Sequence, residues 1–397
     1  MKLNDLRPAL FFDCDGVLNE EPGPQGATKP DDVILLPGAG HAVQRAREAG
    51  RLVVALTNRP QVAKGFITLE ELGHILGRFE ALLAEDGGLL DRIYFCPHYP
   101  EPGLVGAVSE LTFRCECRKP GTLMLRWAFA DLPIDRRRSA LIGDSLRDIG
   151  AARGTDLWAY GVRTGHGCRD RERYERETGT TAPVPDLMFD NVIEAVDFEL
   201  GYTNLAAPAL SAIARFDHGE GGPLIVGLCG RSRAGKSVAA HAIARTLTEK
   251  DIRCLHVQLD AAAEWERNCS EEARNRVESV QQLVRALRGG RSVRDSGYHV
   301  ASRGLGRPAT YDPAEDAVVL LEGNFAGHGD IRDLLDLIVF VEVPPEIQRT
   351  RFVAFHRWEG FDDDAIEDLW RGRSTDEWPR VDRQRDLADL ILMSRVN

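Results

Sequence analysis

The chain has 397 residues, of which 43% are hydrophobic and 28% are charged, a composition typical of a globular protein with two or three domains. Its formal net charge of −12 at pH 7 argues against a surface that binds nucleic acid. We see neither a signal peptide nor an apolar run of 18 residues, so we expect a cytoplasmic protein without a membrane span.

Short apolar runs with helical segments between them predict an α/β fold in two parts. The runs of the first part are ALFFD, LVVALTN, IYFC, SALIGD and LWAYGV, and those of the second are LIVGLCG, CLHVQLD, VVLLEG and LIVFVEV. Because many of them end in small or acidic residues, we expect parallel strands with functional side chains at their carboxyl ends. We place one domain at 1–200, a Gly-rich linker at 201–220 and a second domain at 221–397.

Two aspartates follow the first apolar run, in FFDCDG. Asp13 at a strand end could attack phosphorus and form an acyl phosphate that water later hydrolyses. Asp15 could protonate the leaving oxygen and then activate the water, and Gly16 lets the backbone turn between strand and loop. Taken alone, the pair could equally be two exposed turn aspartates.

Other strand ends of the first part carry groups that suit the same chemistry. Thr57 and Asn58 end the second run and could bind phosphate oxygens, and Lys119 in CRKPG could offset phosphate charge. Asp144 ends a later run and could complete a Mg²⁺ site with Asp13. The sequence therefore predicts a phosphate-transfer site.

These pieces occur in the order found in the haloacid dehalogenase-like (HAD-like) phosphatases, and residues 8–200 resemble that superfamily. The resemblance implies a Rossmann-like domain with Asp13 as nucleophile and Asp15 as general acid/base. It also implies that Asp144 and the backbone carbonyl of Asp15 bind the metal, with Asp148 as a support behind it.

A Cys-x-His and a Cys-x-Cys pair flank a loop rich in Pro and Gly. Three thiolates and one imidazole suit a closed tetrahedral Zn²⁺ site that would stabilise the loop; the alternative is scattered buried cysteines and a surface histidine. The predicted zinc ligands are Cys96, His98, Cys115 and Cys117.

With DGVLN and TNRPQVAKGF, this array resembles the D-glycero-D-manno-heptose-1,7-bisphosphate phosphatases and the related histidinol-phosphate phosphatases. The long span between the pairs favours the heptose type, in which the zinc is structural and Arg118 matches a position that contacts substrate. The chain departs from that pattern at three places near the site. Cys14 replaces an arginine, Ser145 replaces a lysine, and Arg59-Pro60 replaces Gln-Ser. A phosphatase is still expected, while the heptose substrate is left open.

The second part contains a phosphate-binding loop, GRSRAGKS, between an apolar run and a helical segment. Its glycines, Gly230 and Gly235, expose backbone N–H groups to phosphate at a helix N-terminus. Lys236 would reach the β- and γ-phosphates of ATP, and Ser237 would hold Mg²⁺.

Further residues favour a kinase over other nucleotide-binding proteins. Asp260, at a strand end, could orient or deprotonate an acceptor hydroxyl, and Glu322, at another, could bind Mg²⁺. Arg349 and Arg351 suit a lid that closes on the transferred phosphate, although they could instead form a solvated helix face.

Residues 221–397 resemble the uridine kinase/phosphoribulokinase family of P-loop kinases, which implies a parallel sheet and ATP-dependent phosphorylation of a hydroxyl. In the segment that would contact substrate, Tyr298 and Arg303 are retained. Ser296-Gly297 and His299 depart from the nucleoside kinase pattern, so uridine is not established as the substrate.

The sequence therefore favours a bifunctional enzyme that joins a phosphatase of small phosphorylated metabolites to an ATP-dependent kinase. One alternative is a polynucleotide kinase 3′-phosphatase, which has the same order of activities but would need a basic surface. Another is a phosphatase with a regulatory nucleotide-binding domain. The oligomeric state is left open.

Overall fold

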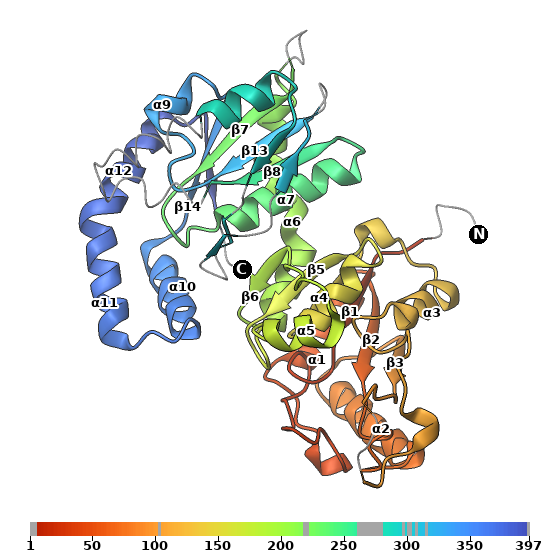
Figure 1. Cartoon of the computed structure of the whole chain (residues 1–397). Coiled ribbons are helices and arrows are strands. Elements are labelled where there is room, and N and C mark those ends of the chain that lie inside the picture. The colour runs from red at the N-terminus through yellow and green to blue at the C-terminus, as the bar shows by residue number, and fades with distance from the viewer. Residues whose placement is uncertain are drawn as a thin grey trace. The chain divides into compact units, whose positions relative to one another are not determined.

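The computed structural model describes residues 6–101, 105–216, 222–259, 281–295, 298–299, 304–305, 309–313 and 317–394. The chain divides into two compact units, 1–200 and 201–397. Each unit is built around a parallel β-sheet with helices packed beside it (Figure 1). The predicted α/β class is confirmed for both units.

The sheet of the first unit has six parallel strands in the order β3-β2-β1-β4-β5-β6. The central strands β1 and β4 are buried along their whole length, as expected for a parallel sheet covered on both faces. In this strand order the chain reverses direction across the sheet between β1 and β4, and the carboxyl ends there form the usual ligand-binding crevice. The strands are β1 (Ala9–Phe12), β2 (Leu52–Asn58), β3 (Arg92–Cys96), β4 (Ala140–Gly143), β5 (Trp158–Val162) and β6 (Leu187–Phe189).

Two helices of the first unit begin at a residue whose side chain satisfies a free backbone N–H group. Thr68 accepts from the backbone N–H of Glu71 at the start of α2, and Ser145 accepts from that of Arg147 at the start of α4. Such caps stabilise a helix by about 1 kcal/mol each. The helices are α1 (Ala39–Glu48), α2 (Leu69–Glu85), α3 (Leu123–Asp131), α4 (Leu146–Arg153), α5 (Arg171–Thr178) and α6 (Val192–Ile213).

The segment that we expected to be a linker, 201–220, is helical as far as Ile213 because α6 continues into it. Its buried residues Tyr202, Ala206, Ala209 and Ile213 recur at helical spacing, which gives the helix an apolar face. We predicted a linker from the mixed polar and small residues of this segment, but alanine is also the best helix former.

Within the described residues, the second unit has a parallel sheet of five strands in the order β15-β14-β7-β13-β8. Its strands are β7 (Leu224–Cys229), β8 (Cys254–Gln258), β13 (Val318–Glu322), β14 (Leu337–Glu342) and β15 (Leu390–Met393). Short strands form two separate antiparallel pairs: β9 (Val293–Asp295) with β12 (Ala309–Tyr311), and β10 (Tyr298–His299) with β11 (Gly304–Leu305). The helices are α7 (Lys236–Glu249), a helix at 281–288, α9 (Gly329–Arg332), α10 (Pro345–Trp358), α11 (Asp363–Gly372) and α12 (Trp378–Asp382).

Across the described parts of the chain, we find no helix with the length and hydropathy needed to cross a membrane.

Candidate active sites

Three carboxylates meet where β1 and β4 end. Asp13 follows β1, Asp144 follows β4, and Asp148 lies in the first turn of α4. One carboxylate oxygen of each lies within 4.8 Å of the others. Burial and the charges of Asp13 and Asp148 raise the pKa of Asp144 well above its ordinary value. Crowded, buried carboxylates of this kind fit a site for a divalent cation.

The turn after β1 requires glycine at position 16. The φ angle of Gly16 is +79°, and a Cβ atom there would lie 2.2 Å from Oδ2 of Asp144. That oxygen also accepts a hydrogen bond from the backbone N–H of His166 at 2.7 Å. The glycine therefore lets the first loop pass directly over the carboxylate of Asp144.

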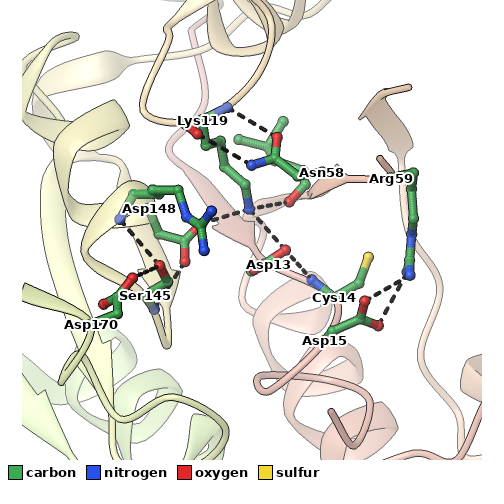
Figure 2. Close-up of polar contacts among 11 residues, drawn as sticks. Asp13, Cys14, Asp15, Asn58, Arg59, Lys119, Ser145, Asp148 and Asp170 are labelled. Carbon is green, nitrogen blue, oxygen red and sulfur yellow. Dashed lines mark hydrogen bonds and ion pairs between the residues drawn. The ribbon is translucent and has the colours of Figure 1, made fainter. Parts of the chain in front are cut away.

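Lys119 is a positively charged residue that pairs with two of these three carboxylates. Its Nζ lies 2.8 Å from Oδ1 of Asp13 and 2.5 Å from Oδ1 of Asp148 (Figure 2). The same nitrogen donates to the carbonyl of Leu56 at 2.7 Å. Burial alone would lower the pKa of Lys119, but the charges of Asp13 and Asp148 raise it above its ordinary value. Lys119 is therefore charged at neutral pH and holds the predicted nucleophile.

The other predicted phosphate-binding residues of the first unit have different surroundings. Thr57 is buried at the carboxyl end of β2. The side chain of Asn58 binds the backbone of Lys119: its Oδ1 accepts from the amide at 3.0 Å, and its Nδ2 donates to the carbonyl at 3.3 Å (Figure 2). Asn58 thus braces the loop that carries Lys119.

Asp15 is paired with Arg59, which follows β2. The guanidinium nitrogens Nη1 and Nη2 of Arg59 lie 2.7 Å and 3.3 Å from the two carboxylate oxygens of Asp15. We did not predict a role for Arg59, although its place directly after a strand end was a usable signal. Burial raises the pKa of Cys14, the residue between the two aspartates, to about 12.

The four predicted zinc ligands come together at the end of β3 and in the loop that follows. Sγ of Cys96 lies 3.5 Å from Sγ of Cys115 and 3.2 Å from Sγ of Cys117, and the sulfurs of Cys115 and Cys117 are 3.3 Å apart. Nδ1 of His98 is 3.1 Å from Sγ of Cys117 and 3.6 Å from Sγ of Cys96. Zn–S bonds of about 2.3 Å in a tetrahedron separate sulfurs by about 3.8 Å, so the array needs little movement to bind Zn²⁺.

The three thiols of the array differ in pKa: the hydrogen bond with Cys117 raises the pKa of Cys96, and burial raises that of Cys115. A hydrogen bond with Cys96 is the main reason that the pKa of Cys117 is lowered to about 5. A thiolate, the form that binds metal, is therefore present at neutral pH.

The phosphate-binding loop of the second unit connects β7 to α7. Gly230 has a φ angle of +144°, and a Cβ atom there would lie 2.3 Å from the carbonyl oxygen of Val341. Gly235, with a φ angle of +98°, is the residue that precedes α7. Glycine is needed at both places because other residues rarely adopt these angles.

Three of the predicted nucleotide-binding residues meet at this loop. Nζ of Lys236 donates to Oδ1 of Asn324 at 2.7 Å, and the hydroxyl of Ser237 donates to Oε1 of Glu322. Oε2 of Glu322 lies 2.9 Å from Nε2 of His256. Burial alone would raise the pKa of Glu322, but the bond to His256 and the neighbouring donors keep it below its ordinary value. The carboxylate is thus ionised beside the serine that we expect to hold Mg²⁺.

Of the two arginines predicted to form a lid, Arg351 lies beside the phosphate-binding loop, whereas Arg349 contacts another helix. Nη1 of Arg351 donates to the hydroxyl of Ser394 at 3.2 Å and lies 3.4 Å from the position of a Cβ on Gly235. Arg349 forms an ion pair with Glu367 of α11. Asp260 and Arg303 lie outside the described residues, and only the backbone placement of Tyr298, in β10, is described.

The comparisons with known proteins each cover part of the chain. A family model described as HAD-hydrolase-like matches residues 116–195. The D-glycero-D-manno-heptose-1,7-bisphosphate 7-phosphatase of Thermosynechococcus vestitus is 34% identical over 193 residues, which cover 48% of this chain and 95% of that protein. The D-glycero-beta-D-manno-heptose-1,7-bisphosphate 7-phosphatase of Pseudomonas aeruginosa is 33% identical over 186 residues, which cover 47% and 94%.

One solved structure that aligns is D,D-heptose 1.7-bisphosphate phosphatase from B. bronchiseptica complexed with magnesium and phosphate. It is 28% identical, with a TM-score of 0.39 over 48% of this chain and 96% of that one. Through its N-terminal half, the chain belongs to the HAD-type phosphatase family of the D-glycero-D-manno-heptose-1,7-bisphosphate 7-phosphatases.

Proposed function

We propose that the first unit is a Mg²⁺-dependent phosphatase that removes one phosphate from a sugar bisphosphate through an aspartyl phosphate on Asp13. The observation that carries the proposal is the placement of Asp13. Its carboxylate contacts the buried cation Lys119 and belongs to the same three-carboxylate cluster as Asp144. The proposed nucleophile, a countercharge for phosphate and the proposed metal ligands thus lie together at the carboxyl edge of the sheet.

The proposed reaction has two steps, formation of the aspartyl phosphate and its hydrolysis. A carboxylate oxygen of Asp13 attacks phosphorus while the bond from phosphorus to the sugar oxygen breaks, and Asp15 gives that oxygen its proton. Water then attacks phosphorus, Asp15 takes a proton from the water, and inorganic phosphate leaves the restored carboxylate of Asp13. Lys119 offsets the charge of the phosphoryl oxygens in both steps. Asp13, Asp144 and the backbone carbonyl of Asp15 would hold Mg²⁺, which supplies further positive charge to the phosphate.

A group of cations beside the site supports a substrate with a second phosphate. Lys64 and Arg118 both approach the ring of Tyr99: Nζ of Lys64 lies 4.5 Å and Cζ of Arg118 lies 5.9 Å from its centroid. Within the described residues, the buried Nη1 of Arg118 has no hydrogen-bond partner. A buried guanidinium nitrogen without a partner is costly, and a phosphate oxygen would satisfy it.

Two more arginines complete this group. Arg147 and Arg173 share one carboxylate, that of Glu177, at 3.2 Å and 2.9 Å. Burial, and then the charge of Arg147, lower the pKa of Arg118, and Arg173 acts on it in the same direction. We call Lys64, Arg118, Arg147 and Arg173 the basic cluster. The four cations of the basic cluster outnumber the one carboxylate, that of Glu177, which two of them share. The cluster therefore suits an anionic group of the substrate.

We expect Arg147→Gln to raise KM for D-glycero-D-manno-heptose 1,7-bisphosphate about tenfold, because one charge-assisted hydrogen bond is lost. The kcat for p-nitrophenyl phosphate, which lacks a second phosphate, should stay close to that of the parent. Arg153→Gln is the matched control. Arg153 lies on the same helix as Arg147, α4, and its substitution breaks an ion pair with Asp186. Equal losses on both substrates, or an unchanged KM, would contradict the role of the basic cluster.

We propose a second function for the second unit: ATP-dependent phosphorylation of a hydroxyl on a small molecule. The observation that favours it is the meeting of Lys236, Ser237 and Glu322 at the glycine loop, since these are the kinds of group that hold nucleotide phosphates and Mg²⁺. A polynucleotide kinase would instead phosphorylate 5′-hydroxyl DNA, and a regulatory domain would bind ATP without phosphorylating any acceptor.

Lys236→Ala should weaken the binding of Mg·ATP at least about tenfold, because a charged donor to the phosphates is removed. Calorimetric titration measures this directly. Lys250→Ala is the control, since Lys250 follows the opposite end of the same helix, α7. Phosphatase turnover should not change. ATP binding equal to that of the parent would contradict the assignment of the loop, and loss of both activities would show that the two units are coupled.

A further inference from the structure

The predicted acid/base residue has a cation of its own. The guanidinium of Arg59 contacts both carboxylate oxygens of Asp15, at 2.7 Å and 3.3 Å (Figure 2). Nδ2 of Asn19 donates to one of these oxygens at 3.1 Å. The side chain of Arg59 is 3% exposed and that of Asp15 is 16% exposed. This carboxylate is therefore held in one orientation before any substrate binds.

The position of Arg59 is set by the sheet. Arg59 directly follows β2, and its backbone N–H donates to the carbonyl of Cys96, the last residue of β3, at 2.7 Å. Strand β2 pairs in parallel with β1, the strand that leads to Asp13 and Asp15. Arg59 is thus anchored between two strand ends instead of on a loose loop, which makes it a firm support for a neighbouring side chain.

The two aspartates do not share their cations. Lys119 pairs with Asp13 at 2.8 Å, and Arg59 pairs with Asp15. Each carboxylate therefore has a cation of its own, one from the loop that precedes α3 and one from the end of β2.

We propose that Arg59 is a positioning residue for Asp15, and that its guanidinium directs the carboxylate toward the leaving oxygen and later toward the attacking water. The inference rests on the phosphatase mechanism proposed above. Proton transfer requires the acid within hydrogen-bond reach of its partner. A carboxylate that turns freely about its side-chain bonds meets this condition only part of the time.

The test separates positioning of the acid from a general structural role. Arg59→Gln should slow the first turnover of a sugar phosphate about 100-fold, the cost of misplacing a reacting group by about 1 Å. The first burst of p-nitrophenol from p-nitrophenyl phosphate should stay close to the parent rate, because this leaving group departs without a proton. The steady-state rate after the burst should fall, since activation of water also needs Asp15. Rapid-quench measurement of both substrates gives these rates.

Two other variants distinguish a loss of positioning from a loss of folding. Arg59→Lys keeps the positive charge but not the two-pronged contact, so its loss on the sugar phosphate should be intermediate. Arg51→Gln breaks another buried ion pair of the same unit, with Glu199, and should lower the melting temperature without changing the ratio of the two first-turnover rates.

The outcomes distinguish the two proposals. Equal slowing of both substrates by Arg59→Gln, or no slowing of either, would overturn the positioning role while leaving the phosphatase function in place. A parent protein that turns over neither substrate would contradict the phosphatase function, and the role of Arg59 would fall with it.

Discussion

Asp13→Asn should lower phosphatase turnover by at least about 10³-fold, because an amide cannot attack phosphorus as the carboxylate does. Lys119 would lose one of its two carboxylate partners but keep Asp148, which lies 2.5 Å from its Nζ. The variant should therefore remain folded. A coupled phosphate-release assay on the sugar bisphosphate measures the loss, and thermal unfolding checks the fold.

The control for this prediction is Asp135→Asn. Asp135 is a half-buried residue of the same unit, before the short 3₁₀ helix Arg136–Arg138, and its substitution should leave turnover unchanged. Mg·ATP binding by the second unit should also persist in Asp13→Asn. If that variant released phosphate at the parent rate, Asp13 would not be the nucleophile.

The second large effect is expected at the Cys/His array. Replacing Cys115 and Cys117 with serine should reduce bound zinc from about one ion per chain to nearly none, because two of four ligands are lost. Metal binding and folding are coupled in such sites. If about 3 kcal/mol of stability is lost, the melting temperature of the first unit should fall by about 6–12 °C. Elemental analysis and calorimetry measure the two quantities.

Cys229→Ser with Cys254→Ser is a matched control, since it removes two thiols from β7 and β8 of the second unit. Zinc content should not change in this variant. A parent protein that is folded but contains no zinc would contradict the metal assignment, as would full zinc occupancy after loss of Cys115 and Cys117.

Strand ends and local spacing made part of the site predictable from the sequence. Asp13 and Asp144 follow apolar runs, and the strand order β3-β2-β1-β4-β5-β6 places those ends beside each other. Cys96 with His98, and Cys115 with Cys117, could be recognised as pairs because both partners of each lie two residues apart. In these cases one short segment contains most of the information.

Contacts between distant segments were not predictable in the same way. Arg59 and Asp15 are 44 residues apart, and their pairing depends on the register of β1 against β2. The side chain of Asn58 contacts the backbone of Lys119, which is 61 residues away in the sequence. Residue type limits what a side chain can bind, and the fold decides which partner is within reach.

Arg147 and Arg173 are further residues that the sequence did not identify. They belong to α4 and α5, and their common feature is the shared carboxylate of Glu177. Charged residues on helices usually face solvent and carry no spacing signal. Only the packing of the two helices places these arginines near Arg118.

The most direct test of the account is chemical detection of the aspartyl phosphate. Asp15→Asn lacks the base that activates water, but it can still react with p-nitrophenyl phosphate, whose leaving group needs no proton. After acid quenching, mass spectrometry of this variant should find one phosphoryl group on the peptide that contains Asp13, and none when Asp13 is also replaced by Asn. Release of p-nitrophenol from Asp15→Asn without phosphoryl on that peptide would contradict the nucleophilic role of Asp13.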